Sequence, residues 1–331
     1  MIRGWRRWIL IGMGFLFFPL SAGAQGGRGY LVLSFDDGYP SWIQTIAPEL
    51  VPYGGKATAF VNNQRIHNRF IRFEDLKTLQ DRYGWEIGTH TYHHYNAVEF
   101  VKRNGLEKWM AEEVDRSVKE LTDKGLKIRS LVFPFNIFDR GLTEKVRERF
   151  SSYRRWEDFP IAEGRREDGS IPGTSIDLAG YVPMSLLRQW ITYAQEQGKA
   201  LFLYGHEVLP DDRFFEGKVA EVGSDYLIAE GEISLPDRTA LCLVPDKNTL
   251  KRGGTLRVGE VQGRKVTIPG SDLPRRVKVG STFILGPCYG TPLSYFREML
   301  AFCSGRLTFL TTEAFLNLKG KPPDPGEKVH P

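Results

Sequence analysis

The sequence is poor in cysteine, and this excludes one class of metal site. Only three of the 331 residues are cysteines, and the spacing of Cys242, Cys288 and Cys303 is too wide for a Cys-x-x-Cys metal pair. An exported chain can oxidise one pair, which leaves at least one thiol free. Our default interpretation is that all three are buried core residues.

The charge is also nearly balanced. The chain has 45 Lys and Arg against 40 Asp and Glu, but Arg3, Arg6 and Arg7 lie in an N-terminal segment without acids. Removal of that segment leaves 42 basic residues, a net charge of +2. The sequence pI of 9.0 therefore gives little reason to predict a nucleic-acid partner, whereas an uncharged polymer fits.

Long apolar runs are absent except near the start, where Trp8–Leu20 follows the three arginines. The run contains Pro19 and is short for a membrane helix, which needs about 20 apolar residues. Ala22-Gly23-Ala24 matches a small-residue cleavage site. We predict a signal peptide over residues 1–24 and an exported protein, periplasmic or extracellular, with no stable membrane span. An uncleaved anchor is the alternative.

The central part of the chain alternates strands with helices, which predicts parallel α/β architecture. Helical apolar spacing occurs over Phe73–Leu79, Met110–Leu121 and Leu187–Ala194. The predicted strands are Tyr30–Phe35, Lys56–Val61, Trp85–Gly88, Ser130–Phe133, Tyr153–Trp156 and Ala200–Gly205.

One β-rich segment interrupts this pattern. We predict that residues 209–289 form an inserted all-β module, that the main domain covers 25–208 and 290–318, and that the tail 319–331 is disordered. The module has predicted strands at Leu227–Leu235, Ala240–Val244, Thr255–Val261, Arg264–Ile268 and Arg276–Leu285. It either caps a substrate groove, binding sugar through residues such as Tyr226 or Phe283, or is passive. The passive interpretation is favoured, since no aromatic platform is visible.

Three polar clusters follow apolar strands. Asp36 and Asp37 end the first strand, His90 and His94 follow the third, and His206 follows the strand Ala200–Gly205. In parallel α/β folds, functional sites collect at the C-terminal ends of strands. Histidines four residues apart can face one cation, and adjacent acids at a strand end project in different directions. We therefore expect one shared site.

These clusters carry a resemblance. Ser34-Phe35-Asp36-Asp37-Gly38, His90-Thr91-Tyr92-His93-His94 and Leu203-Tyr204-Gly205-His206-Glu207 resemble motifs one, two and five of the polysaccharide deacetylases with the NodB homology domain, carbohydrate esterase family four. The resemblance implies a distorted (β/α) barrel of seven or eight strands.

By position, the resemblance also implies residue roles. Asp36 is the general base and His206 the general acid, while Asp37, His90 and His94 bind a divalent metal, usually zinc. Cobalt and nickel also suit this ligand set. Thr91 is expected to support the histidine loop, and His93 has no role in the pattern.

Motif three departs from the family. Pro134 and Phe135 align, but the arginine that normally orients the base is absent and Asn136 replaces glycine. Arg154 or Arg155 is a candidate replacement. The Phe135 amide is a candidate oxyanion donor. Motif four is not recognisable, and its nearest candidates are Trp156 and Asp158. The predicted substrate-binding residues are Pro134, Phe135, Asn136 and Trp156.

Together these features predict metal-dependent hydrolysis of N-acetyl groups from an acetylated polysaccharide or oligosaccharide outside the cytoplasm. Two alternatives stay open. The first is an esterase that acts on O-acetyl groups, as in acetyl-xylan. The second is a non-catalytic carbohydrate-binding protein on the same scaffold, which the missing arginine makes worth testing.

Overall fold

The computed structural model describes residues 29–236, 240–247, 254–270 and 273–318. The predicted signal peptide and the predicted disordered tail lie outside these residues. Among the helices described, none has the length and apolar character needed to cross a membrane.

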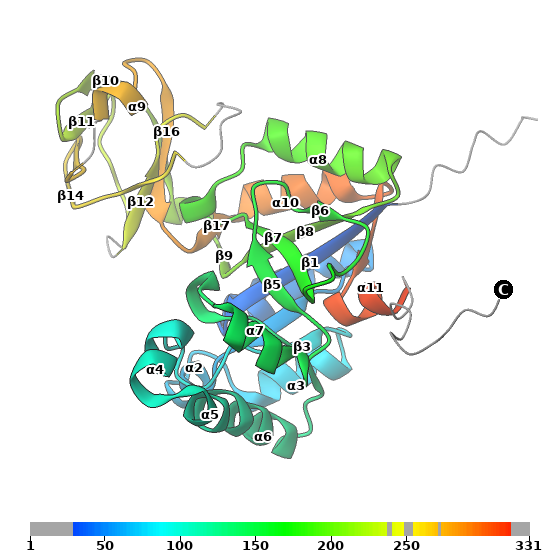
Figure 1. Cartoon of the computed structure of the whole chain (residues 1–331). Coiled ribbons are helices and arrows are strands. Elements are labelled where there is room, and N and C mark those ends of the chain that lie inside the picture. Colours follow the sequence, from blue (N-terminus) through cyan, green and yellow to red (C-terminus); the bar gives the residue numbers. More distant parts are fainter. Residues whose placement is uncertain (1–28, 237–239, 248–253, 271–272, 319–331) are drawn as a thin grey trace, which may run out of the picture.

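The main domain is built around a closed parallel sheet (Figure 1). Each strand pairs in parallel with the next, and the last returns to pair with the first through Tyr30–Phe35 and Ala200–Gly205. The closed strands are β1 (Gly29–Asp37), β2 (Thr58–Val61), β3 (Glu86–Thr89), β4 (Ile128–Leu131), β5 (Tyr153–Trp156), β7 (Ser170–Ser175) and β8 (Ala200–Gly205). This seven-stranded barrel confirms the predicted fold class.

Two further strands distort the barrel. Strand β18 (Leu307–Leu310) pairs in parallel with the first half of β1, along the edge whose second half pairs with β2. The short strand β6 (Ile161–Ala162) lies antiparallel on β8. Because β18 brings the C-terminal part of the domain against the first strand, the segments on either side of the module form one body.

Helices surround the barrel. An apolar core packs them against the sheet, with Trp42, Trp85 and Phe296 among its buried aromatic side chains. The helices are α1 (Ala47–Leu50), α2 (Asn63–His67), α3 (Phe73–Asp81), α4 (Ala97–Asn104), α5 (Leu106–Trp109), α6 (Arg116–Asp123), α7 (Arg140–Arg147), α8 (Met184–Glu196), α10 (Leu293–Cys303) and α11 (Thr312–Leu318), with π-helical turns η1 (Trp42–Ile46) and η3 (Met110–Asp115).

The six strands predicted for the main domain are present within a few residues of their predicted ends. Strand β7 was not predicted. Its sequence, Ser-Ile-Pro-Gly-Thr-Ser, has little apolar alternation and contains proline and glycine, which strands disfavour. It forms because the neighbouring strands β5 and β8 pair with it on both sides.

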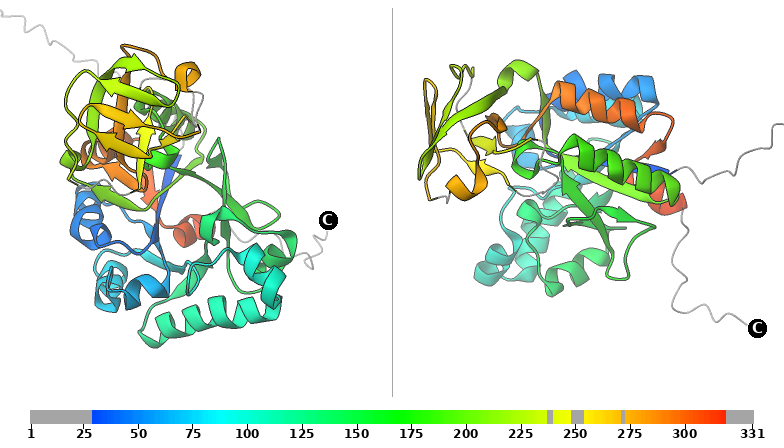
Figure 2. Two further views of the ribbon diagram at one scale, coloured as in Figure 1. Left: turned by 90° about the vertical axis from the view of Figure 1, so that its left-hand side faces the viewer. Right: turned by 90° about the horizontal axis from the view of Figure 1, so that it is seen from above.

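A second sheet of seven strands lies at one side of the barrel (Figures 1 and 2). It has its own buried core, which includes Val219, Leu243 and Phe283. Its strands are β10 (Phe215–Val222), β11 (Tyr226–Ala229), β12 (Leu241–Val244), β13 (Leu256–Arg257), β14 (Glu260–Gln262), β15 (Lys265–Thr267) and β16 (Thr282–Pro287), with helix α9 (Leu273–Arg276). All lie within the predicted module of residues 209–289.

Several details of the module differ from prediction. The strand predicted at Leu227–Leu235 ends at Ala229, and the segment predicted as one strand, Thr255–Val261, holds two separate strands, β13 and β14. The predicted strand Arg276–Leu285 is wrong at its start, since Arg276 ends α9 and β16 begins only at Thr282. Strand β10 was not predicted. It pairs with both β16 and β11, so long-range partners hold a segment in which only Val219 is fully buried.

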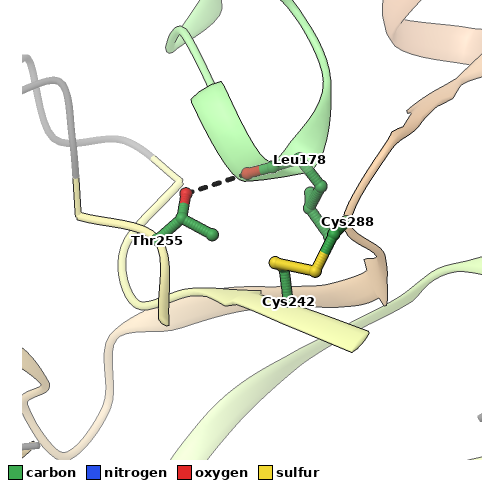
Figure 3. Close-up of a disulfide and its surroundings, with 4 residues drawn as sticks. All are labelled: Leu178, Cys242, Thr255 and Cys288. Carbon is green, nitrogen blue, oxygen red and sulfur yellow. Dashed lines mark hydrogen bonds between the residues drawn. A yellow bond between two sulfur atoms is a disulfide. The ribbon is translucent and has the colours of Figure 1, made fainter. Parts of the chain in front are cut away.

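The chain leaves and re-enters the barrel through adjacent strands. Strands β9 (Glu207–Leu209) and β17 (Gly290–Pro292) form a parallel pair. Cys288, two residues before β17, forms a disulfide with Cys242 of β12 (Figure 3). All three cysteines are buried, as our default interpretation expected, but Cys242 and Cys288 are bonded to each other and only Cys303 is a free thiol.

Candidate active site

A polar cleft of about 640 Å³ opens at the C-terminal ends of the barrel strands. This volume lies within the roughly 300–1,000 Å³ of typical ligand sites. Five predicted residues from three strand ends meet in it. The cleft is lined by Asp36, Asp37, Tyr39, Asn62, Gln64, Arg65, Asn68, Phe70, His90, His93, His94, Phe133, Phe135, Asn136, Tyr204, His206 and Tyr289.

Asp37, His90 and His94 form a compact cluster of possible cation ligands. The Nε2 atoms of the two histidines are 3.2 Å apart. Asp37 Oδ1 lies 3.2 Å from His94 Nε2 and 3.6 Å from His90 Nε2. All three ligand atoms thus face one point, as the spacing of the motifs predicted.

These spacings fit a divalent cation. Zinc bound by N and O ligands at about 2.0–2.2 Å in a tetrahedron holds neighbouring ligand atoms roughly 3.3 Å apart. Burial, and then the nearby His90, lower the pKa of His94 to about 4, so its imidazole is neutral and its lone pair is free to bind a cation. The donor set and its geometry therefore suit zinc.

The histidine loop owes its shape to local contacts. Thr91 and His94 both have positive φ, 66° and 64°, so the loop is a tight turn and not a helical face. The His94 N–H donates to Thr91 Oγ1 at 3.3 Å, which is the support expected of Thr91. His90 Nδ1 lies 2.7 Å from the Val132 carbonyl oxygen, an orientation that leaves Nε2 free for the cation.

His93 has a structural role that the sequence did not indicate. The buried carboxylate of Glu113 accepts the His93 backbone N–H at 2.9 Å, and its other oxygen lies 2.6 Å from His93 Nδ1. Glu113 belongs to η3, which packs beside the loop. His93 therefore anchors the loop that carries His90 and His94.

Asp36 is held by Arg154. The Arg154 guanidinium forms a bidentate pair with the Asp36 carboxylate, with Nη1 2.9 Å from Oδ1 and Nη2 bonded to Oδ2, and both side chains are buried. Burial alone raises the pKa of Asp36, but the charge and hydrogen bonds of Arg154 outweigh it and lower the pKa. Asp36 is thus ionised, as a base must be.

Arg154 is one of the two candidates for the arginine missing from motif three, and the structure selects it. Neighbouring residues of a strand face opposite sides, so Arg155 points away and pairs with Asp168 at 3.0 Å. The Arg154 guanidinium stacks 3.7 Å from the Tyr204 ring centroid. Gly173 gives it space, since a Cβ there would meet Arg154 Cδ at 2.5 Å.

His206 is paired with Asp177. The fully buried Asp177 lies with Oδ2 2.7 Å from His206 Nδ1, and its Oδ1 accepts the His206 backbone N–H at 3.1 Å. Burial alone lowers the pKa of His206, but the charge and hydrogen bond of Asp177, helped by Asp37 and Asp36, raise it to about 9. His206 thus carries a proton at neutral pH.

Asp177 was not predicted. It follows the unpredicted strand β7, and the sequence Ser175-Ile176-Asp177 has no distinctive spacing. The only available signal was its place two residues after a strand, and that strand was itself hard to recognise. Ser175 and Thr291 donate further hydrogen bonds to its carboxylate, at 3.0 and 3.1 Å.

Of the four predicted substrate-binding residues, two line the cleft and two do not. Phe135 and Asn136 line the cleft in a tight turn, η4 (Pro134–Asn136), where both have positive φ. Phe135 is 58% exposed and packs its ring on His94. Pro134 is buried beneath the turn. Trp156 is 48% exposed at the end of β5 and is not among the described residues that line the cleft.

Comparison with known proteins connects part of the chain to a family. Residues 23–148 match the family model described as polysaccharide deacetylase. This segment includes Asp36, Asp37, His90 and His94 but ends before Arg154. No curated protein matches the chain.

Several solved structures are similar. A family 4 carbohydrate esterase from Streptomyces lividans in complex with acetate is 16% identical, with a TM-score of 0.40 over 54% of this chain and 79% of that one. The peptidoglycan deacetylase PdaC from Bacillus subtilis is 17% identical, with a TM-score of 0.38 over 55% and 76%. IcaB from Ammonifex degensii is 25% identical, with a TM-score of 0.34 over 38% and 58%.

Proposed function

We propose, on the premise that the chain belongs to the polysaccharide deacetylase family, that it removes N-acetyl groups from a carbohydrate polymer outside the cytoplasm with the help of a divalent cation. The observation that carries this proposal is the convergence of an ionised carboxylate, a three-ligand cation cluster and a protonated histidine in one open cleft. Each is a group that hydrolysis of an amide needs.

The reaction is the addition of water to an acetamide, which gives acetate and an amine. When bound, a divalent cation supplies Lewis-acid polarisation of the acetyl carbonyl and a lower pKa for water. Asp36 accepts the proton of the attacking water. The Phe135 amide is the proposed donor to the oxyanion. His206 then donates its proton to the departing nitrogen, with Asp177 holding the imidazole in position.

The proposed cation is zinc, held by Asp37, His90 and His94. The ligand spacing supports this choice, and cobalt and nickel suit the same donors. The pairing of Asp36 with Arg154 also weakens the alternative of a non-catalytic binding protein. That alternative was based on the absent arginine of motif three, and Arg154 supplies its charge.

Export from the cytoplasm is part of the proposal. The Cys242–Cys288 disulfide supports it, because such bonds persist mainly in oxidising compartments. Fractionation of cells that express the full chain tests this part by itself. We expect the protein in the periplasm or medium, with its N-terminus near Gln25.

The function is tested by acetate release from a panel of acetylated carbohydrates. The panel contains N-acetylglucosamine oligosaccharides, peptidoglycan and O-acetylated xylan, each assayed with the native protein, after chelation, and after zinc is restored. We expect acetate release from an N-acetylated substrate that chelation abolishes and zinc restores. Release from xylan alone would identify an O-acetyl esterase. Binding of a polymer without release would identify a binding protein.

A further inference from the structure

Tyr289 is an aromatic residue that the module contributes to the cleft. It is the last residue of the predicted module and lies between β16 and β17. Its side chain is 41% exposed, and it is one of the residues that line the cleft. Its ring centroid lies 4.8 Å from that of His206. An exposed aromatic ring is thus held directly beside the proton donor.

The backbone of Tyr289 is fixed to β9, the strand that begins directly after His206. The Glu207 N–H donates to the Tyr289 carbonyl oxygen at 3.3 Å, and Gly290 pairs with Glu207 in the β9–β17 ladder. Two residues further on, Thr291 donates to the carboxylate of Asp177. The segment that positions Tyr289 therefore also contacts the partner of His206.

The chain is also anchored on the N-terminal side of Tyr289, at Cys288. Cys288 is joined to Cys242 by the disulfide, its N–H donates to Ala240, and its carbonyl accepts the Ala179 N–H at 2.8 Å. Figure 3 shows the disulfide beside Leu178, whose carbonyl accepts a hydrogen bond from the module's Thr255 at 2.8 Å. Because both flanks are held, the backbone of Tyr289 has little conformational freedom left to lose when the ring binds a ligand.

The proposed reaction indicates which part of the substrate lies beside the Tyr289 ring. His206 donates its proton to the nitrogen of the acetamide, so the sugar ring attached to that nitrogen must lie next to His206. Aromatic faces pack against the apolar C–H face of a sugar, and tyrosine adds a polar hydroxyl at its rim. Phe135 lies on the other side, against the cation-binding His94, where the acetyl group is placed.

We propose that Tyr289 binds a sugar ring of the substrate beside His206, and that the inserted module is therefore part of the substrate-binding site. This inference rests on the proposed function and deepens it. It replaces the two residues that the sequence suggested for sugar binding. Phe283 is fully buried in the module's own core, and Tyr226 is not among the described residues that line the cleft.

Binding provides the first test. In the Asp36→Asn background, where turnover is slowed, calorimetry with zinc present measures the Kd of an N-acetylglucosamine pentasaccharide. We expect Tyr289→Ala to weaken binding about fivefold, the size of one aromatic contact, and Tyr289→Phe to bind nearly as well as the parent. An unchanged Kd for Tyr289→Ala, or no binding by the parent protein, would overturn the inference.

Kinetics provides the second test. Tyr289→Ala is compared with Tyr193→Ala, which removes a similarly exposed tyrosine (38%) of α8 that does not line the cleft. We expect the ratio of kcat/KM for the pentasaccharide to that for p-nitrophenyl acetate to fall about fivefold for Tyr289→Ala and to stay constant for Tyr193→Ala. An equal loss on both substrates would indicate a structural role and contradict sugar binding.

The two proposals fail in different ways. If the wild-type protein releases no acetate from any acetylated carbohydrate, the proposed function is wrong, and the calorimetric result still decides whether Tyr289 binds sugar. If acetate is released but neither the Kd nor the kcat/KM ratio depends on Tyr289, the function stands and the inference about the module is wrong.

Discussion

The cation-binding side of the cleft and its proton-donating side differ in how their residues are distributed along the chain. The first side, Asp37, His90 and His94, comes from two strand ends within residues 37–94, and each ligand lies in a recognisable motif. The second side combines His206 with Asp177 and Tyr289, from residues 177–289. Of these three residues, only His206 lies in a recognisable motif.

The difference has a physical origin. Cation ligands must meet at one point with fixed spacing, so their residue types and local turns are tightly constrained. A histidine that donates a proton needs only a nearby negative charge and a fixed orientation. Any strand end that reaches Nδ1 can provide these, and here the end of β7 does so. The residues of the second side therefore need no fixed spacing along the chain, although their chemistry is defined.

The largest expected effects concern the proposed cation ligands and the proposed base, Asp36. His90→Ala should lose bound zinc and nearly all turnover, because one of three ligands is removed. Asp36→Asn should keep the zinc, because none of its three ligands is changed, but lose about 10²–10⁴ in kcat, since the proton acceptor is removed. Metal content by mass spectrometry, together with acetate release, separates the two. The control His67→Ala, outside the cleft lining, should retain metal and activity; a metallated, active His90→Ala protein would refute the ligand assignment.

The next effect concerns the proton donor. Asp177→Asn removes the charge that raises the pKa of His206 to about 9, and burial then lowers that pKa. Protonated His206 is required, so activity is lost as pH rises through its pKa. We expect kcat at neutral pH to fall about 10- to 100-fold and the basic limb of the pH–rate profile to move to lower pH. A lower rate with an unmoved basic limb would argue against this pairing.

The third effect concerns the ion pair of Arg154 with Asp36. Arg154→Gln leaves a buried carboxylate without its cation, which typically destabilises a fold by about 3 kcal/mol. Burial then raises the pKa of Asp36, so the acidic limb of the pH–rate profile should move to higher pH. Urea unfolding and pH profiles measure both. Arg155→Gln, which breaks the exposed pair with Asp168, is the matched control and should cost less than about 1 kcal/mol.

The smallest expected effect on catalysis concerns the Cys242–Cys288 disulfide of the module. Replacing Cys242 and Cys288 together by alanine should lower the free energy of unfolding by about 2–4 kcal/mol, because the bond closes a loop with a sequence separation of 46. We expect KM for the pentasaccharide to rise a few-fold with little change in kcat, as Tyr289 loses its fixed position. Calorimetric melting and steady-state kinetics measure both. A large loss of kcat with an unchanged KM would contradict this expectation and would indicate that the disulfide acts on His206 through Asp177.

Much of this protein was predictable from local patterns. Buried strands such as β1 and β8 are short apolar runs, and their alternation with amphipathic helices predicts parallel α/β architecture. The closed barrel was implied by the family resemblance. Five site residues were placed by their position at strand ends. Strand β7 was not predictable, because Ser170–Ser175 becomes a strand only through its neighbours.

The sequence by itself determined the parallel α/β architecture and the residues of the proposed cation site, since these depend on periodicity and on motifs a few residues long. Only the tertiary structure decided that Arg154 pairs with Asp36, that Asp177 holds His206, and that Tyr289 reaches the cleft. Each of these pairs joins residues 29 to 118 positions apart. Contacts of this kind depend on which strands lie side by side, and no local pattern records that arrangement.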